Sequence, residues 1–424
     1  MTLLALFATL GAASAMHAAL RRAEPAAGAV VATPPERIRL EFTEPVEPAL
    51  SRIVVVTPRG DSLPLRVAVD PRDIRALVAV PPPLGRGVYG VVWRVVAADG
   101  HRIRGRYSFT VERNAVDGGR PAVSVAPAKV DSAAKVDSAA IVAQAREAEP
   151  ASAASPPTAA GILRGLALTA LLAFAGLVAL LAWRLPDTGR GPLRAAVLAG
   201  VAAAALLAVH FVVWIGYAAP GAMLSARELS AAMLTTSGRL ELARLLLVLG
   251  AVWLLLARRL AASAWLGVLA LVASSVIGHP AAMSPALAIP GKAIHLLAAA
   301  PWVGGVLWIA TADRRHPSTP GGVRRVSSLA LGAVVVVSVA GVAEALLFLG
   351  SMRALVATAY GQIVLGKALG TLALVGFGAW HRRLVDDGGS PAITRLSRSV
   401  RYELAIMAGV GVLGGVLSYV SPRL

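Results

Sequence analysis

Eight apolar stretches, each of roughly 20 residues, fill the chain from residue 161 to its carboxyl end. A helix of that length can cross the hydrocarbon core of a bilayer. The whole chain is 57% hydrophobic and only 15% charged, which is typical of membrane proteins. Residues 161–424 are therefore predicted to form an eight-helix transmembrane bundle. The expected spans are 161–183, 194–217, 239–257, 261–279, 291–311, 326–350, 361–381 and 401–420.

Arginines are distributed unevenly among the loops that join these stretches. If the first helix enters from outside, most of them fall on the inner side, as the positive-inside rule requires. This placement accounts for much of the formal net charge of +18, and no basic helix or zinc-knuckle pattern accompanies it. We therefore expect a lipid membrane, and not nucleic acid, as the partner of this basic chain. The inner arginines are Arg184, Arg190, Arg194, Arg258, Arg259, Arg314, Arg315, Arg324, Arg325, Arg382, Arg383, Arg395, Arg398 and Arg401, whereas the outer side holds Arg227, Arg353 and Arg423.

Residues 1–16 have the pattern of a signal peptide, which agrees with this orientation. A short apolar core, Leu3–Leu10, precedes the cleavage pattern Ala13-Ser14-Ala15. Cleavage after Ala15 leaves Met16 as the first residue, whereas cleavage one residue later leaves His17 first. The segment predicts export of the region that follows it.

Residues 17–112 have the pattern of a β domain. The run 37–42 alternates polar and apolar residues, as a half-buried strand does. Further runs rich in Val, Ile and aromatic residues are separated by Pro or Gly, which predicts a small antiparallel sandwich or barrel, like cupredoxin or immunoglobulin domains. The further strands are expected at Ser51–Thr57, Ala76–Val80, Val88–Val96 and Arg104–Val111.

A linker is predicted at residues 113–160. Ala, Pro, Ser and Val dominate it, and the sequence Ala-Lys-Val-Asp-Ser-Ala occurs at 128–133 and again at 134–139. Such a segment buries too little apolar surface to offset the entropy of ordering it. We expect a disordered tether between the two domains.

A turn at the end of the strand 88–96 carries two candidate metal ligands. Asp99-Gly100 has the composition of a tight turn, and His101 follows it. With a further nitrogen donor such as His17, these groups suit the tetragonal geometry of Cu(II). The chain has no cysteine, so disulfides and thiolate sites are excluded. The alternative is a plain hairpin turn with a surface histidine.

Four segments of the β domain form a recognisable pattern: His17-Ala18-Ala19-Leu20, the run 40–46, the run 91–101 and the run 105–109. Together they resemble the periplasmic copper-binding family CopC. The resemblance implies that His17, Asp99 and His101 bind copper as Cu(II). It also implies partners among periplasmic copper carriers. The Met-rich Cu(I) site of some members is absent.

Ionisable residues within the predicted bundle form a second candidate site. Such groups are costly in a bilayer and usually face a cavity or one another. One interpretation is structural, with a Glu344–Lys367 pair and hydrogen-bonded histidines. The other is a copper path in the outer half of the membrane, with Met233 as an additional soft ligand if copper is reduced. The residues of that path are His210, His279, Met283, His295 and Glu344.

Two other features of the bundle are given simpler interpretations. Glu241 and Arg244, three residues apart, are expected to form a local ion pair. His381, next to Arg382 and Arg383, is expected to mark the cytosolic end of its helix, where cations suit the helix dipole.

Three segments of the membrane half carry a second pattern: the run 292–305, the run 355–361 followed by Lys367, and Thr236-Ser237-Gly238-Arg239 with Arg244. They resemble the membrane family CopD, and a fused CopC–CopD order is known. The resemblance implies copper resistance and copper import across the inner membrane by a protein that is not an enzyme. Two alternatives stay open: a haem-containing membrane cupric reductase that uses His210 and His295, and an oxidative copper enzyme.

Overall fold

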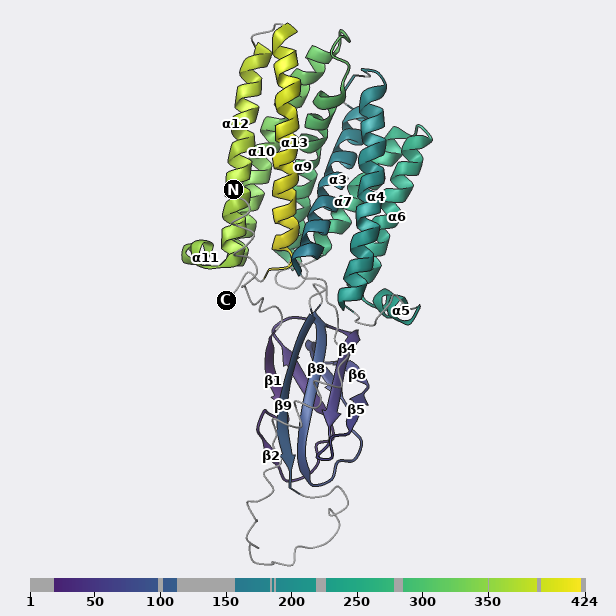
Figure 1. Ribbon diagram of the computed structural model, residues 1–424, viewed down its shortest axis with the longest axis vertical. Coiled ribbons are helices and arrows are strands. Elements are labelled where there is room, and N and C mark those ends of the chain that lie inside the picture. Colours follow the sequence, from purple (N-terminus) through teal and green to yellow (C-terminus); the bar gives the residue numbers. More distant parts are fainter. Residues whose placement is uncertain are drawn as a thin grey trace, which may run out of the picture. The chain divides into compact units, whose positions relative to one another are not determined.

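The computed structural model describes residues 19–97, 102–112, 157–183, 185–186, 188–218, 226–277, 285–349, 351–386 and 390–420. The chain divides into two compact units (Figure 1). One comprises His17–Ala154 with Gly216–Thr235, and its described core is built from strands. The other comprises Ser155–Ile215 and Thr236–Leu424 with Met1–Met16, and it is helical where it is described.

The β unit contains two sheets in its described part. One sheet has the strand order β1-β3-β7-β6 and the other β2-β9-β8-β4-β5. All five strands expected from the sequence are present, and every pairing is antiparallel except that of β2 with β9, which is parallel. The strands are β1 (Leu20–Glu24), β2 (Val30–Val31), β3 (Ile38–Phe42), β4 (Val46–Val56), β5 (Ser62–Leu65), β6 (Val67–Asp70), β7 (Asp73–Ala79), β8 (Gly87–Ala97) and β9 (Arg102–Val111).

The core of this unit lies between the two sheets. The alternation in β3 buries Ile38, Leu40 and Phe42, as the sequence pattern predicts. Phe42 meets Trp93 of the other sheet edge-on, with ring centroids 5.3 Å apart. Trp93 pairs with Gly105 on β9, and a Cβ atom at position 105 would overlap the indole ring. A glycine is therefore required there, because only its backbone lets the indole lie against the strand.

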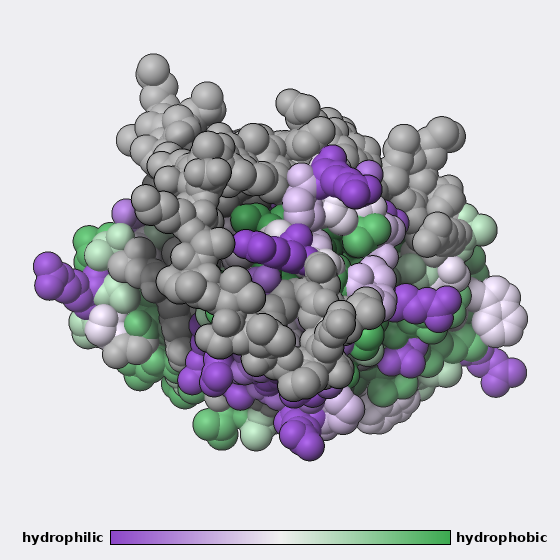
Figure 2. Space-filling view, turned by 90° about the horizontal axis from the view of Figure 1, so that it is seen from below, coloured by the Kyte–Doolittle hydropathy of each residue, from purple (hydrophilic) through white to green (hydrophobic). Residues whose placement is uncertain are grey.

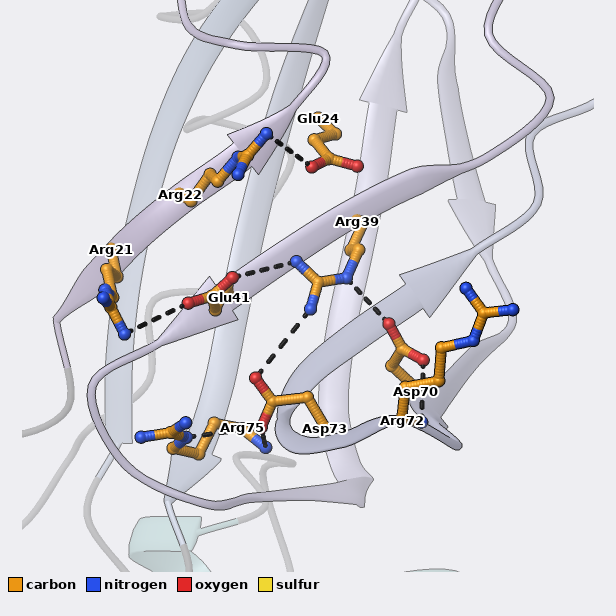
Figure 3. A network of polar contacts seen from close by, with 9 residues as sticks. All are labelled: Arg21, Arg22, Glu24, Arg39, Glu41, Asp70, Arg72, Asp73 and Arg75. Carbon is orange, nitrogen blue, oxygen red and sulfur yellow. Dashed lines mark hydrogen bonds and ion pairs between the residues drawn. The ribbon is translucent and has the colours of Figure 1, made fainter.

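The polar face of β3 carries a network of charged side chains centred on Arg39 (Figure 3). Its guanidinium lies 2.7 Å from Asp70 Oδ2, 3.0 Å from Glu41 Oε2 and 3.8 Å from Asp73 Oδ2. The hydrogen bond from Arg39 lowers the pKa of Asp70, and the backbone N–H of Arg75 does most to lower the pKa of Asp73. The hydrogen bonds from Arg39 to Asp70 and Glu41 raise the pKa of Arg39.

These lowered pKa values predict acid sensitivity of the β unit. A carboxyl group whose pKa is lower in the folded state stabilises the fold above its unfolded pKa, near 3.8 here, and the stabilisation disappears as the pH falls through the folded pKa. We expect the free energy of unfolding of the β unit to fall between about pH 5 and pH 2. Denaturant titration over this range measures the slope. Arg39→Gln should flatten it, whereas Arg22→Ala, which removes the exposed pair with Glu24, should leave it unchanged.

The helical unit has a helix at each of the eight predicted segments. In Figure 1 its long helices run side by side. Two short helices lie in connections between the long ones: α11 (Met352–Ala357) belongs to this unit, and α5 (Ala226–Leu234) belongs to the unit that holds the strands. The long helices are α3 (Pro157–Trp183), α4 (Arg190–Ala218), α6 (Thr236–Leu256), α7 (Leu260–Val276), α9 (Pro285–Thr311), α10 (Thr319–Leu349), α12 (Ala359–Asp386) and α13 (Ser390–Leu417).

Six of the helices in the described part of the chain are long and apolar enough to cross a membrane, which makes this a multi-pass membrane protein. The two others are consecutive: α7 has only 17 residues, and α6 contains Arg239, Glu241 and Arg244. The expected count of eight crossings is therefore not confirmed. Because α6 and α7 are neighbours in sequence, the orientation of the later helices is the same whether both cross or neither does.

The outside of the helical unit is apolar and its helices pack closely. Leu198, Trp253, Val339 and Leu372 are 65–69% exposed, as lipid-facing side chains are. Figure 2 shows hydrophobic residues (green) reaching the surface along the margin of the molecule. Inside, a Cβ atom at Gly176 of α3 would overlap the carbonyl oxygen of Ala300 in α9. This close approach of α3 and α9 uses a small residue, as membrane helix interfaces commonly do.

Candidate metal centres

The predicted copper ligands of the β unit, His17, Asp99 and His101, lie outside the described residues. The strands that bound the Asp99–His101 turn are described. β8 ends at Ala97, β9 begins at Arg102, and Val96 pairs with Arg102. The four residues 98–101 therefore connect two neighbouring antiparallel strands.

The chain next to His17 is anchored at the same end of the β unit. The N–H of Ala19 donates to Thr43 Oγ1, and the N–H of Thr43 donates to the carbonyl oxygen of Ala19, both at 2.9 Å. Thr43 precedes Val46 by three residues, and Val46 pairs with Ala97 at the end of β8. These hydrogen bonds and this strand pairing anchor Ala19 and Ala97, the described residues nearest to the predicted ligand segments, at one end of the sheets.

His210 of α4 lies in a buried polar cluster of the helical unit. Its side chain has no exposed surface, its Nε2 atom lies 3.0 Å from the hydroxyl of Tyr419, and its Nδ1 atom lies 3.7 Å from Glu241 Oε2. Glu241 forms the predicted ion pair with Arg244, and both are buried, at 2% exposure. We call His210, Glu241, Arg244 and Tyr419 the α4–α6 cluster. The Nε2 atom of His210 contacts the Tyr419 hydroxyl, whereas its Nδ1 atom is buried without a hydrogen-bond partner.

The carbonyl oxygen of Ile277 connects the α4–α6 cluster with the neighbouring helices. Arg164 of α3 donates to this oxygen at 2.9 Å and lies over the ring of Tyr419, 5.9 Å from its centroid. Lys292 of α9 donates to the same oxygen at 2.8 Å. One carbonyl group beyond the end of α7 therefore accepts hydrogen bonds from two cationic side chains.

His295 and Glu344 line a cavity of about 190 Å³ between α3, α9, α10, α12 and α13, which we call the first cavity. Its other ionisable groups are Lys292, Tyr360 and Lys367, and most of the remaining lining is apolar. His295 Nδ1 and Glu344 Oε1 are buried and have no hydrogen-bond partner. A buried polar atom without a partner is costly. The first cavity thus offers one imidazole nitrogen and one carboxylate oxygen to a ligand.

The structure separates the residues of the predicted membrane path. His210 belongs to the α4–α6 cluster, and His295 and Glu344 belong to the first cavity, whereas His279 and Met283 lie outside the described residues. Among the described residues, no three His, Asp or Glu side chains come together closely enough to hold a metal ion. The copper path through the membrane therefore stays a prediction.

The apolar span of α12 ends at His381, where the sequence places the end of the membrane segment, although the helix itself continues to Asp386. The side chain is buried at 9% exposure, which its position beside two arginines does not indicate. Its Nδ1 atom lies 3.3 Å from Glu403 Oε2 and its Nε2 atom 2.5 Å from Ser399 Oγ, both on α13. The available signal was Glu403 itself, a carboxylate inside an otherwise apolar stretch.

Comparison with known proteins finds one family match in each half of the chain. Residues 20–112 match the CopC domain family, and residues 321–417 match the family of copper resistance protein D. Copper resistance protein C of Escherichia coli is 37% identical over 104 residues, which cover 23% of this chain and 82% of that protein. The CopC structure from Methylosinus trichosporium OB3b is 35% identical, with 23% of this chain and 95% of that chain covered and a TM-score of 0.22.

A further relative spans both halves. Copper transport protein CutJ of Bacillus subtilis (strain 168) is 27% identical over 432 residues, which cover 94% of this chain and 72% of that protein. The resemblances predicted from the sequence are confirmed. The chain belongs to the copper resistance protein C family, and the same polypeptide carries a match to copper resistance protein D toward its carboxyl end.

Proposed function

We propose that this chain imports copper. Its exported β domain captures Cu(II) from periplasmic carriers with His17, Asp99 and His101, and its membrane domain moves the ion across the inner membrane. Residues 113–160 act as a tether that raises the local concentration of captured copper near the membrane. The union of a CopC and a CopD domain in one chain supports this order of events.

The observation that carries the proposal is the strand frame of the β domain. The Ala19–Thr43 hydrogen bonds and the Val46–Ala97 pairing anchor the chain segments next to His17 and Asp99 at one end of the sheets. Two imidazoles and a carboxylate at one point suit Cu(II), which prefers nitrogen-rich tetragonal sites and leads the divalent affinity series.

In the membrane domain, we assign reception of the ion to the first cavity. Two of its buried side-chain atoms have no hydrogen-bond partner and can serve as metal ligands, His295 Nδ1 and Glu344 Oε1. Lys292 and Lys367 also line the cavity and repel a cation, so the carboxylate of Glu344 is needed to balance part of their charge.

Copper accumulation by cells that depend on this chain tests the proposal. Cells with the chain should accumulate more copper than cells without it, and His295→Ala should return accumulation toward the level of the latter. His316→Ala, at an inner loop, is the matched control and should have no effect. Unchanged accumulation in His295→Ala at equal expression would overturn the membrane assignment.

The absorption spectrum of the purified protein tests the reductase alternative. Copper import by the proposed route requires no haem. A Soret band in stoichiometric amount would contradict the proposal and favour a haem-containing cupric reductase.

A further inference from the structure

A second cavity adjoins the first within the helical unit. It has a volume of about 230 Å³ and lies between α9, α10, α12 and α13. Trp302 of α9 and Leu374 of α12 line both cavities, and both are buried, at 6% and 3% exposure. These two apolar side chains therefore form a shared wall between the two cavities.

Two helices line the cavities with residues seven positions apart. On α12, Lys367 faces the first cavity, Leu374 faces both, and His381 faces the second. On α9, the corresponding order is His295, Trp302 and Ile309. Seven residues make about two helical turns, or roughly 10 Å, so each series lies along one face of its helix. The cavities are thus successive along the direction of these helices.

The other two helices repeat this order. On α10, Ala330 lines the second cavity, and Val337 and Glu344 line the first. On α13, Glu403 lines the second cavity, whereas Val410 and Leu417 line the first. Each of these four helices therefore lines both cavities with residues along one of its faces.

The second cavity contains a polar pair in an otherwise mostly apolar wall. His381 and Glu403 line it, with His381 Nδ1 3.3 Å from Glu403 Oε2. Glu403 is 3% exposed. Ionisable side chains within a membrane bundle are rare, and those that face a cavity are candidates for an ion or proton pathway.

We propose that the two cavities are successive stations of one ion route, with Trp302 and Leu374 as its closed barrier and His381 and Glu403 as its inner station. That copper is the ion rests on the proposed function, whereas the route and barrier rest on the cavity walls alone. At the inner station the carboxylate of Glu403 balances the charge of the cation, and His381 supplies a nitrogen ligand when it gives up its contact with Ser399 or Glu403.

The absence of cysteine from the chain allows a direct test by single-cysteine labelling. Thr371 lines the first cavity, Gly378 lines the second, and Leu372 is 65% exposed on the same helix. No atom lies within 4 Å of a Cβ at position 378, so a cysteine fits there. A membrane-impermeant cationic thiol reagent should label Thr371→Cys from the outer face of sealed vesicles and Gly378→Cys from the inner face. Leu372→Cys, the lipid-facing control, should be labelled from neither.

Removal of the barrier should change this pattern. In a Gly378→Cys background, Trp302→Ala should make the cysteine reactive from the outer face. If the Trp302→Ala protein does not fold, Leu374→Ala removes the other side chain of the barrier and should have the same effect. Labelling of positions 371 and 378 from the same face in the otherwise unchanged chain would overturn the proposal. Unchanged labelling in both barrier variants would overturn it as well.

Copper accumulation separates this proposal from the proposed function. Glu403→Gln should lower copper accumulation while the labelling pattern is retained. Full accumulation in Glu403→Gln would overturn the inner station. If the parent chain labels as expected yet moves no copper, the route is supported and copper import is contradicted.

Discussion

Replacing His101 with alanine should lower the affinity of the purified chain for Cu(II) by at least about 100-fold, because even groups that only orient a metal ligand cost 10- to 100-fold when they are lost. The turn between β8 and β9 offers one imidazole, and its loss leaves the proposed site with a single histidine. Competition with a chelator of known affinity measures the change. The nitrogen hyperfine structure of the copper EPR signal should lose one contributor.

Three further variants test the other proposed ligands and control for histidine loss elsewhere in the chain. Asp99→Asn keeps an oxygen donor but removes its charge, so its effect should be smaller than that of His101→Ala. If processing leaves His17 as the first residue, His17→Ala should lower the Cu(II) affinity as much as His101→Ala does. If Met16 is the first residue, His17→Ala should lower the affinity less. The intact mass of the exported protein decides between these termini. His316→Ala is the control, and an affinity of His101→Ala equal to that of the parent chain would exclude the turn as the copper site.

A strand such as β3 was predictable because one of its faces is buried and the other is not. The alternation of β3 appears directly in its burial, with Ile38, Leu40 and Phe42 inside and Arg39 and Glu41 between them. The partners of the polar residues were not predictable in the same way. Arg39 meets Asp70, 31 residues away, because β7 brings β3 and β6 into one sheet. The parallel pairing of the two-residue strand β2 also leaves no periodic signal.

The membrane helices were predictable from length and hydropathy, but their contacts were not. A helix that is apolar on all sides gives no indication of which face packs inside the bundle. His210 therefore could be placed at a depth but not beside Tyr419, which is 209 residues away. The same limit explains why His381 was interpreted from its flanking arginines, since its partner Glu403 lies on another helix.

The candidate sites also differ in how much of each could be inferred from the sequence. Asp99 and His101 belong to a short local pattern, a strand followed by a turn, whereas His17 lies 82 residues before Asp99 in the sequence. The first cavity depends on five helices, so residues such as Lys292 and Tyr360 become site residues only through packing. A local sequence pattern is therefore enough to propose ligands in the β domain, whereas the lining of the first cavity becomes visible only in the packed structure.

The α4–α6 cluster gives the second large expected effect. Glu241→Ala should destabilise the helical unit by about 3–5 kcal/mol, because it leaves the guanidinium of Arg244 buried without the carboxylate that balances its charge. Glu241 and Arg244 are each 2% exposed, so solvent cannot compensate for the loss. The Nδ1 atom of His210 loses its nearest carboxylate in the same variant. Thermal unfolding of the purified protein in detergent, followed by the loss of helical circular dichroism, measures the change.

The double variant Glu241→Leu/Arg244→Leu separates the cost of an unbalanced charge from a general loss of packing. Removing both charges leaves no buried ion without a partner, and replacing a buried ion pair by apolar residues is often neutral or stabilising. The double variant should therefore be more stable than Glu241→Ala alone. Leu246→Ala on the exposed face of α6, where the leucine is 58% exposed, should have little effect. If the double variant is the least stable of the three, the pair holds the fold through its contacts with His210 and Ser274 and not through mutual charge balance.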